Sequence, residues 1–254
     1  MSDSWLNIVN LCHFPHFISY YGQAYQIDPR NVQALLLKGC VLKDMSKTQE
    51  ALLHFREAVR MAPYRYEAHQ GLVECYIKAR KIREALTTAS NACKVLGNSA
   101  RSLTLFASVL AKDSLTVEKA KTMLEKALAQ EPTYLDAVYL LAEVLGEEQQ
   151  YTAAIELLRR QLHHQSTCKL HQMLGEFLSA NNELQEALDQ YSIALGMDPT
   201  NKKVLDGIQK VEKVTDSIDR GQDDDMEALE ESGEDVDFDA SDTEVSWADN
   251  EWFS

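Results

Sequence analysis

Two stretches of this chain, EALLHFREAVRMAP at residues 50–63 and EALDQYSIALGMDP at residues 186–199, share one pattern of small and aromatic residues. In the first, Ala51 is followed four positions later by Phe55, three positions later by an alanine, and five positions later by a proline. The second stretch repeats the same steps from Ala187. Recurrence of such a pattern far along one chain is the sequence signature of a repeat protein.

The prolines supply the repeat period. Pro29, Pro63, Pro132 and Pro199 are separated by 34, 69 and 67 residues, which is close to one, two and two periods of 34. Five copies of the pattern, here called the packing ladder, comprise Gly39, Ala51, Phe55, Ala58 and Pro63; Val73, Ala85, Ala89, Ala92 and Gly97; Ala107, Ala120, Leu124, Ala127 and Pro132; Ala142, Ala154, Leu158, Gln161 and Ser166; and Gly175, Ala187, Tyr191, Ala194 and Pro199. The sequence therefore predicts five full repeats.

Three details complete the pattern. Glycine replaces proline at Gly97, one extra residue precedes Ala120, and Tyr21, Ala24 and Pro29 supply the end of a half unit before the first full repeat. Each full unit holds two helical patterns, for example at about 32–44 and 47–61, joined by a short polar turn.

The residue types of the ladder suit a pair of packed helices. A glycine or alanine on the first helix lets the second approach closely, and an aromatic residue or leucine fills the space between them. The proline ends the second helix because its ring cannot continue one. No pair buries both of its faces alone, so neighbouring pairs must stack into an α-solenoid with an extended concave groove.

The ladder resembles the tetratricopeptide repeat over roughly residues 15–200. That resemblance implies an all-α, right-handed superhelix. Residues 202–215, with one apolar face, are expected to form the helix that caps the array. We predict a leader at residues 1–14, repeats and cap at 15–215, and an acidic disordered tail at 216–254.

The strings NVQALLLKG, EALLHFREAVRMAP, QEALDQYSIALGMDP and WADNEWF resemble the subunit 7 family of the anaphase-promoting complex, a multi-subunit ubiquitin ligase. The resemblance covers about residues 17–254 and departs at the start, so we expect an N-terminally shortened form. It implies a non-catalytic scaffold in the nucleus and cytoplasm that supports ubiquitination of cell-cycle regulators in mitosis and cell division. Its partners would be other subunits of that complex, especially those with tetratricopeptide repeats, and longer forms would pair as homodimers.

The charges are concentrated at one end of the chain. Residues 216–254 hold 16 acidic residues and one basic residue, which leaves 24 of each in residues 1–215. A basic surface for nucleic acid is therefore absent, and an anionic membrane would repel the tail. No apolar run approaches the roughly 18 residues of a membrane span. We expect neither nucleic acid nor a membrane as a partner.

The concave groove is the first candidate site. Some tetratricopeptide proteins hold a partner's C-terminal carboxylate with a clamp of cationic and amide side chains, and the corresponding positions here are Leu36, Cys40, Gly71, Arg101 and Leu105. Only Arg101 keeps the required charge, which disfavours the alternative of a co-chaperone adaptor. Leu36 and Leu37, with Tyr139 and Leu140, are interpreted as packing or protein-contact residues, and such a groove suits a neighbouring subunit.

Metal binding and catalysis have little support in the sequence. His164, Cys168 and His171 fall at helical spacing, but a zinc site needs four converging ligands, and this group straddles a predicted turn. No nucleophile, phosphate-binding or dinucleotide motif occurs. We therefore expect no metal, no cofactor and no enzymatic activity.

The tail carries two candidate phosphorylation sites. Ser232 and Ser241 each precede an acidic residue by three positions, which is the pattern that an acid-directed kinase accepts. Trp247, Trp252 and Phe253 interrupt the acidic run and are candidates to contact a partner. The tail alone would also fit a third alternative, an acidic chaperone of histones or other basic proteins.

Overall fold

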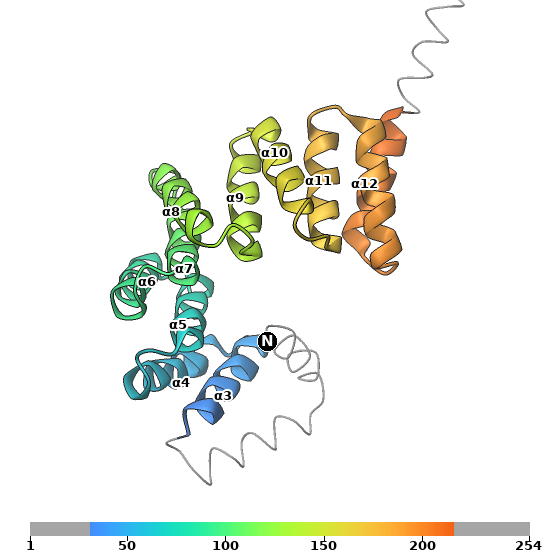
Figure 1. The fold of residues 1–254 in the computed structure, drawn as a ribbon. Helices are drawn as coiled ribbons and strands as arrows, with labels where there is room; N and C mark the ends of the chain where they lie inside the picture. Colours follow the sequence, from blue (N-terminus) through green and yellow to red (C-terminus); the bar gives the residue numbers. More distant parts are fainter. Residues whose placement is uncertain (1–30, 216–254) are drawn as a thin grey trace, which may run out of the picture. The chain divides into compact units, whose positions relative to one another are not determined.

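A computed structural model describes residues 31–215 of the chain. Within that range every regular element is helical, and Figure 1 shows the helices following one another in pairs. The elements are α3 (Val32–Asp44), α4 (Thr48–Met61), α5 (Tyr66–Lys78), α6 (Ile82–Leu96), α7 (Ala100–Leu110), α8 (Val117–Gln130), α9 (Leu135–Glu147), α10 (Tyr151–Leu162), α11 (Cys168–Ala180) and α12 (Leu184–Met197). Residues 202–215 are also helical. The all-α repeat fold expected from the sequence is confirmed.

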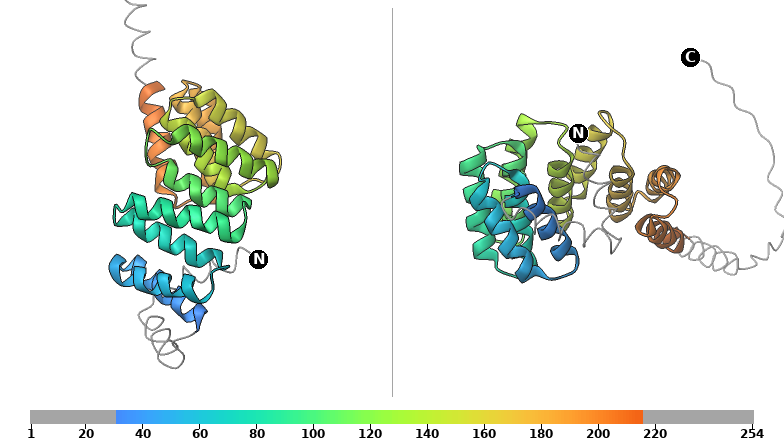
Figure 2. Two further views of the ribbon diagram at one scale, coloured as in Figure 1. Left: turned by 90° about the vertical axis from the view of Figure 1, so that its left-hand side faces the viewer. Right: turned by 90° about the horizontal axis from the view of Figure 1, so that it is seen from below.

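Among the described residues, 31–208 belong to one compact unit and 209–215 to a second, and the following description concerns the first. Its odd-numbered helices are here called A helices and its even-numbered ones B helices. Each A helix packs on the B helix that follows it, and each B helix packs on the next A helix. The A helices α3, α5, α7 and α9 also contact one another in sequence, as the stacked pairs in Figure 2 illustrate.

Three of the A helices begin at polar side chains that cap them. Asn31, Ser99 and Thr167 each accept a hydrogen bond from a backbone N–H in the first turn of the helix that follows. Such caps satisfy a donor that has no partner within the helix. The B helices lack this side-chain bond, but several carry a glutamate in the first turn, where it complements the positive end of the helix dipole.

Four A helices end in the same hydrogen-bonded cap. In α3 the Ser46 N–H donates to the Lys43 carbonyl and the Lys47 N–H donates to the Leu42 carbonyl, which is the Schellman pattern. The residue after the C-cap takes a positive φ in each case, at Ser46 (62°), Arg80 (57°), Gln149 (61°) and Asn182 (66°). The chain makes these four sharp turns without glycine.

The B helices end in a different way. Ala62, Glu131 and Asp198 leave the helical region, with φ between −139° and −130°, and each is followed by a ladder proline. This matches the bias that proline imposes on the residue before it. At the end of α6 the ladder has glycine instead, and Gly97 has φ 73° and ψ 171°. Only glycine commonly adopts that conformation.

Several expectations concern residues outside the described range. These are the leader at 1–14, the half repeat with Tyr21, Ala24 and Pro29, the acidic tail, the phosphorylation candidates Ser232 and Ser241, and the aromatic residues Trp247, Trp252 and Phe253. The domain boundaries likewise stay predictions.

Candidate interaction surfaces

The first repeat is joined to the second through one buried aromatic ring. Phe55 on α4 is fully buried, and its ring fills the space beside two glycines on neighbouring A helices. A Cβ atom on Gly39 of α3 would lie 2.8 Å from Phe55 Cζ, and a Cβ on Gly71 of α5 would meet the same ring even more closely. The ring therefore fixes the distance between α3, α4 and α5.

The same arrangement recurs in the last repeat. A Cβ on Gly175 of α11 would lie 2.8 Å from the Tyr191 ring, and a Cβ on Gly207 would lie 2.6 Å from its Cζ. Burial, followed by the nearby charge of Glu176, raises the pKa of Tyr191 to about 12. The phenol is thus held in its neutral form, as a packing group.

The structure places the ladder alanines in the interior. The predicted packing alanines Ala51, Ala58, Ala85, Ala92, Ala120, Ala127, Ala142, Ala154, Ala187 and Ala194 all have 0% exposure. The sequence analysis did not predict Gly71 and Gly207 as packing residues. Each lies 32 positions after a ladder glycine, Gly39 or Gly175, and this spacing could have indicated them. Gly146, where a Cβ would collide with Phe177 of α11, was not predicted either. That the ladder sets the stability of the array stays a prediction.

Two tyrosine rings on the A helices lie next to cationic side chains, as two tyrosine–cation pairs. The first joins α5, α7 and the start of α9: the Arg101 guanidinium lies 5.9 Å from the centre of the Tyr66 ring, and the Tyr134 hydroxyl donates to Asp136 Oδ2 at 3.0 Å. Burial and the charge of Asp136 raise the pKa of Tyr66 to about 12. The pKa of Tyr134 is raised as well, first by burial and then by the nearby Tyr66 and Asp136 side chains.

The second pair lies on α9 and α11. Lys169 Nζ is 4.1 Å from the centre of the Tyr139 ring and 3.6 Å from Glu143 Oε1. The Tyr139 and Thr167 hydroxyls are hydrogen bonded at 2.9 Å. Partly exposed aromatic rings with fixed hydroxyls and adjacent cations are typical of surfaces that bind other proteins, because they offer apolar area at low entropic cost. Tyr66, Arg101, Tyr134, Tyr139 and Lys169 are here called the A-helix tyrosine row.

The clamp positions are mostly inaccessible. Leu36, Gly71 and Leu105 are buried, Cys40 is partly buried, and Arg101 is exposed above Tyr66. A single accessible cation cannot reproduce a five-residue carboxylate clamp. The arrangement therefore gives no geometric support to the co-chaperone alternative.

The two buried histidines have local hydrogen bonds. His69 Nε2 donates to the Pro63 carbonyl at 2.8 Å. His171 Nδ1 donates to Gln190 Oε1, and its Nε2 accepts from the Ser166 hydroxyl, both at 2.8 Å. Each histidine thus ties an A helix to an adjacent loop or B helix. Within residues 31–215, no group of three His, Cys, Asp or Glu side chains converges in a way that could hold a metal ion.

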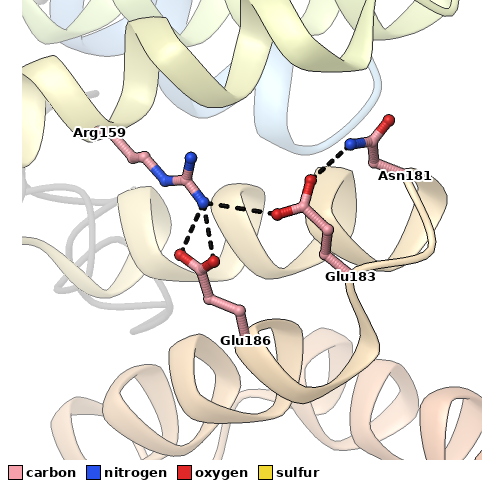
Figure 3. Close-up of polar contacts among 4 residues, drawn as sticks. All are labelled: Arg159, Asn181, Glu183 and Glu186. Atoms are coloured by element: carbon pink, nitrogen blue, oxygen red, sulfur yellow. Dashed lines mark hydrogen bonds and ion pairs between the residues drawn. The ribbon is translucent and has the colours of Figure 1, made fainter. Parts of the chain in front are cut away.

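Charged side chains also connect neighbouring repeats. Arg159 of α10 lies 2.8 Å from both carboxylate oxygens of Glu186 in α12 and 3.6 Å from Glu183, which in turn accepts from Asn181 (Figure 3). Lys43 of α3 pairs with Glu74 of α5 at 2.6 Å. Because the Arg159 pair is partly exposed, we assign it about 1 kcal/mol or less, and its main role is orientation.

Comparison with known proteins supports the repeat fold. A family model for the tetratricopeptide repeat matches residues 42–92 and 116–175. A thermophilic tetratricopeptide-repeat protein of Thermus thermophilus superposes with a TM-score of 0.60 at 20% identity, covering 71% of this chain and 98% of that one. A chain of the crystal structure of the APC/C hetero-tetramer Cut9–Hcn1 superposes with a TM-score of 0.62 at 15% identity. The match covers 80% of this chain and 40% of that one. The matched residues therefore carry tetratricopeptide repeats, and the chain shares the fold of these solved structures.

The relatives found by sequence similarity share one name. The chain is 48% identical over 265 residues to anaphase-promoting complex subunit 7 of Mus musculus and, equally, of Homo sapiens, covering 99% of this chain and 46% of each relative. The subunit 7 of Arabidopsis thaliana is 34% identical over 202 residues. The chain therefore spans less than half the length of each of these curated relatives. Within residues 31–215, none of the helices has the length and apolar character needed to cross a bilayer.

Proposed function

We propose that this chain is a non-catalytic scaffold subunit of an anaphase-promoting complex, in the nucleus and cytoplasm, where it supports ubiquitination of cell-cycle regulators. The observation that carries the proposal is the 48% identity to subunit 7 over almost the whole of this chain. A repeat array fits the role because its stacked helices present a rigid, extended surface to neighbouring proteins.

The surface proposed to meet a neighbouring subunit is the A-helix tyrosine row. Two of its three rings lie against cations, namely Arg101 over Tyr66 and Lys169 over Tyr139. Preorganised aromatic side chains lose little entropy on binding, so they contribute strongly to interfaces. A tetratricopeptide-containing subunit is the partner expected from the relatives, and homodimerisation is proposed for longer forms.

The test is co-purification of the tagged chain from dividing mammalian cells, followed by mass spectrometry. We expect other anaphase-promoting complex subunits to be recovered at constant ratios. Recovery of heat-shock chaperones or histones without those subunits would contradict the proposal and favour the co-chaperone or histone-chaperone alternative.

A pair of matched variants tests the surface separately from the subunit role. Arg101→Glu combined with Lys169→Glu reverses two charges of the A-helix tyrosine row and should reduce recovery of the complex. The control, Lys112→Glu with Lys202→Glu, makes the same charge change at two exposed lysines elsewhere. Equal recovery by both double variants would overturn the assignment of the surface and leave the subunit proposal standing.

A further inference from the structure

A hollow of about 610 Å³ lies between the second and third repeats, on the side formed by the B helices. It is bounded by α6 and α8, with α7 forming its base. The residues that line it are Ser90, Cys93, Lys94, Asn98, Leu103, Phe106, Met123, Lys126, Ala129 and Gln130. It is here called the α6–α8 hollow, and none of its members belongs to the A-helix tyrosine row.

Short side chains form part of each wall of the hollow. Helices α6 and α8 both pack against α7, and they face the space between them with Ser90 and Cys93 on one wall and Ala129 on the other. The base is apolar, since Leu103 and Phe106 come from α7. The volume falls within the range of about 300–1,000 Å³ that is usual for ligand-binding pockets.

Hydrogen bonds fix the wall and the turn beside it. The Cys93 thiol donates to the Ser102 carbonyl at 3.2 Å, and the Ser102 hydroxyl donates to the Gly97 carbonyl at 2.6 Å. Ser102 is fully buried, and Gly97 holds its positive φ at this point. The hollow is thus formed before any occupant arrives, which lowers the entropic cost of binding.

The charged side chains that line the hollow have one sign. Lys94 stands on α6 and Lys126 on α8, and the lining contains no acidic side chain. In the described part of the chain neither lysine has an ion-pair partner within 4.0 Å. A third cation, Lys119, lies 5.6 Å from the centre of the Phe106 ring. An apolar base between two cationic walls is complementary to a group that is aromatic in the middle and anionic on both sides.

We propose that the α6–α8 hollow binds a peptide segment of a partner protein that presents one large aromatic side chain flanked by carboxylates. The aromatic ring would pack on Leu103 and Phe106, with the Met123 thioether at its edge. The flanking carboxylates would pair with Lys94 and Lys126. A basic segment would be repelled by the same two lysines. The site is separate from the surface proposed for subunit assembly and does not depend on that role.

The direct test is a fluorescence-anisotropy titration of the full chain against a labelled synthetic peptide, Glu-Glu-Trp-Glu-Glu. Lys94→Glu with Lys126→Glu should weaken binding by about tenfold or more. Ala129→Trp, at an exposed position on α8, should fill the hollow and have a similar effect. The control, Lys112→Glu with Lys202→Glu, makes the same change in net charge and should bind within about twofold of the original chain.

Two further peptides separate the contributions of the aromatic ring and the carboxylates. Replacing Trp with Ala, or all Glu with Lys, should abolish binding. Equal affinity for the original chain and for the Lys94/Lys126 variant would overturn the proposal, as would binding that is unaffected by Ala129→Trp. Absence of binding to the original chain would overturn it directly.

A second measurement needs no variant and so does not depend on any variant folding. Cys93 lines the hollow, whereas Cys168 lies on α11, and the alkylation of both can be followed in one sample by peptide mapping. The peptide should slow the alkylation of Cys93 severalfold and leave that of Cys168 unchanged. Equal rates with and without saturating peptide would contradict binding in the hollow.

Discussion

The ring of Phe55 occupies the space that a side chain on Gly71 would need, although the two residues belong to different repeats. Phe55 lies on α4, and Gly71 lies in the middle of α5. The ring is fully buried between α3 and α5, so neither helix can shift to relieve a larger residue without losing packing.

We expect Gly71→Ala to lower the free energy of unfolding by about 1–3 kcal/mol, because the added methyl group would overlap the Phe55 ring. The control is Gly196→Ala in α12, where nothing lies within 4 Å of the methyl group that the substitution adds. That change should stabilise the helix by up to about 1 kcal/mol through helix propensity. Thermal denaturation followed by far-UV circular dichroism would measure both. Equal effects of the two substitutions would contradict the proposed contact.

Gly97→Pro, which restores the ladder proline, should destabilise the protein. Proline requires φ near −65°, whereas Gly97 has φ 73°. Gly97→Ala should also cost about 1–3 kcal/mol, although no atom lies within 4 Å of the added Cβ, because the backbone conformation itself is strained for any L side chain. Urea denaturation of both variants would test this. A proline variant as stable as the original chain would show that this turn can adopt the form found at Pro63.

Arg80→Gly should raise the free energy of unfolding by up to about 1 kcal/mol. Arg80 follows the C-cap of α5 with φ 57°, a conformation that costs a residue with a side chain about 1–2 kcal/mol and glycine little. Asn182→Gly, at the equivalent position of α11, should give a smaller gain because asparagine tolerates this conformation better. The two melting temperatures, measured side by side, check the ranking, and a larger gain at Asn182 would oppose it.

Gln161→Met should stabilise the fourth repeat. Gln161 occupies a ladder position that is alanine in the other repeats, and its Nε2 is buried without a hydrogen-bond partner in the described part of the chain. A buried donor without a partner costs about 1–3 kcal/mol, and methionine keeps the length of the side chain without that donor. Gln185→Met, at an exposed position of α12, is the control and should change stability little. A lower melting temperature for Gln161→Met would indicate that the amide is satisfied.

The tyrosines predict a loss of stability at alkaline pH. The pKa values of Tyr66 and Tyr191 are raised from 10 to about 12 in the folded chain, so the unfolded chain loses these protons first. Their contribution is complete below pH 10 and disappears as the pH rises from about 10 to 12. Tyr66→Phe keeps the ring beside Arg101 and should flatten the fall of stability in this range. Midpoints of urea denaturation, measured for both chains across this pH range, would test the prediction. If stability falls equally steeply with pH in the Tyr66→Phe variant, Tyr66 is not a cause of the fall.

The sequence by itself determined the helical repeats. Small residues at fixed spacing, with prolines such as Pro63 and Pro132 at the ends, are local signals, because helix propensity and proline's fixed φ act over a few residues. The pattern therefore indicated the all-α class and the pairing of helices. The likeness in sequence to subunit 7 was visible at the same level, since it depends on the strings of residues alone.

Only the tertiary structure decided which surfaces meet across repeats. The contact of Phe55 with Gly71, the stacking of Lys169 on Tyr139 and the space between α6 and α8 each join residues whose distance depends on how one pair of helices packs on the next. The turn at Gly97 shows the difference most directly, since the repeat pattern alone would accept proline there. That residue has a positive φ where the chain turns from α6 into α7, and these two helices pack on each other in the tertiary structure.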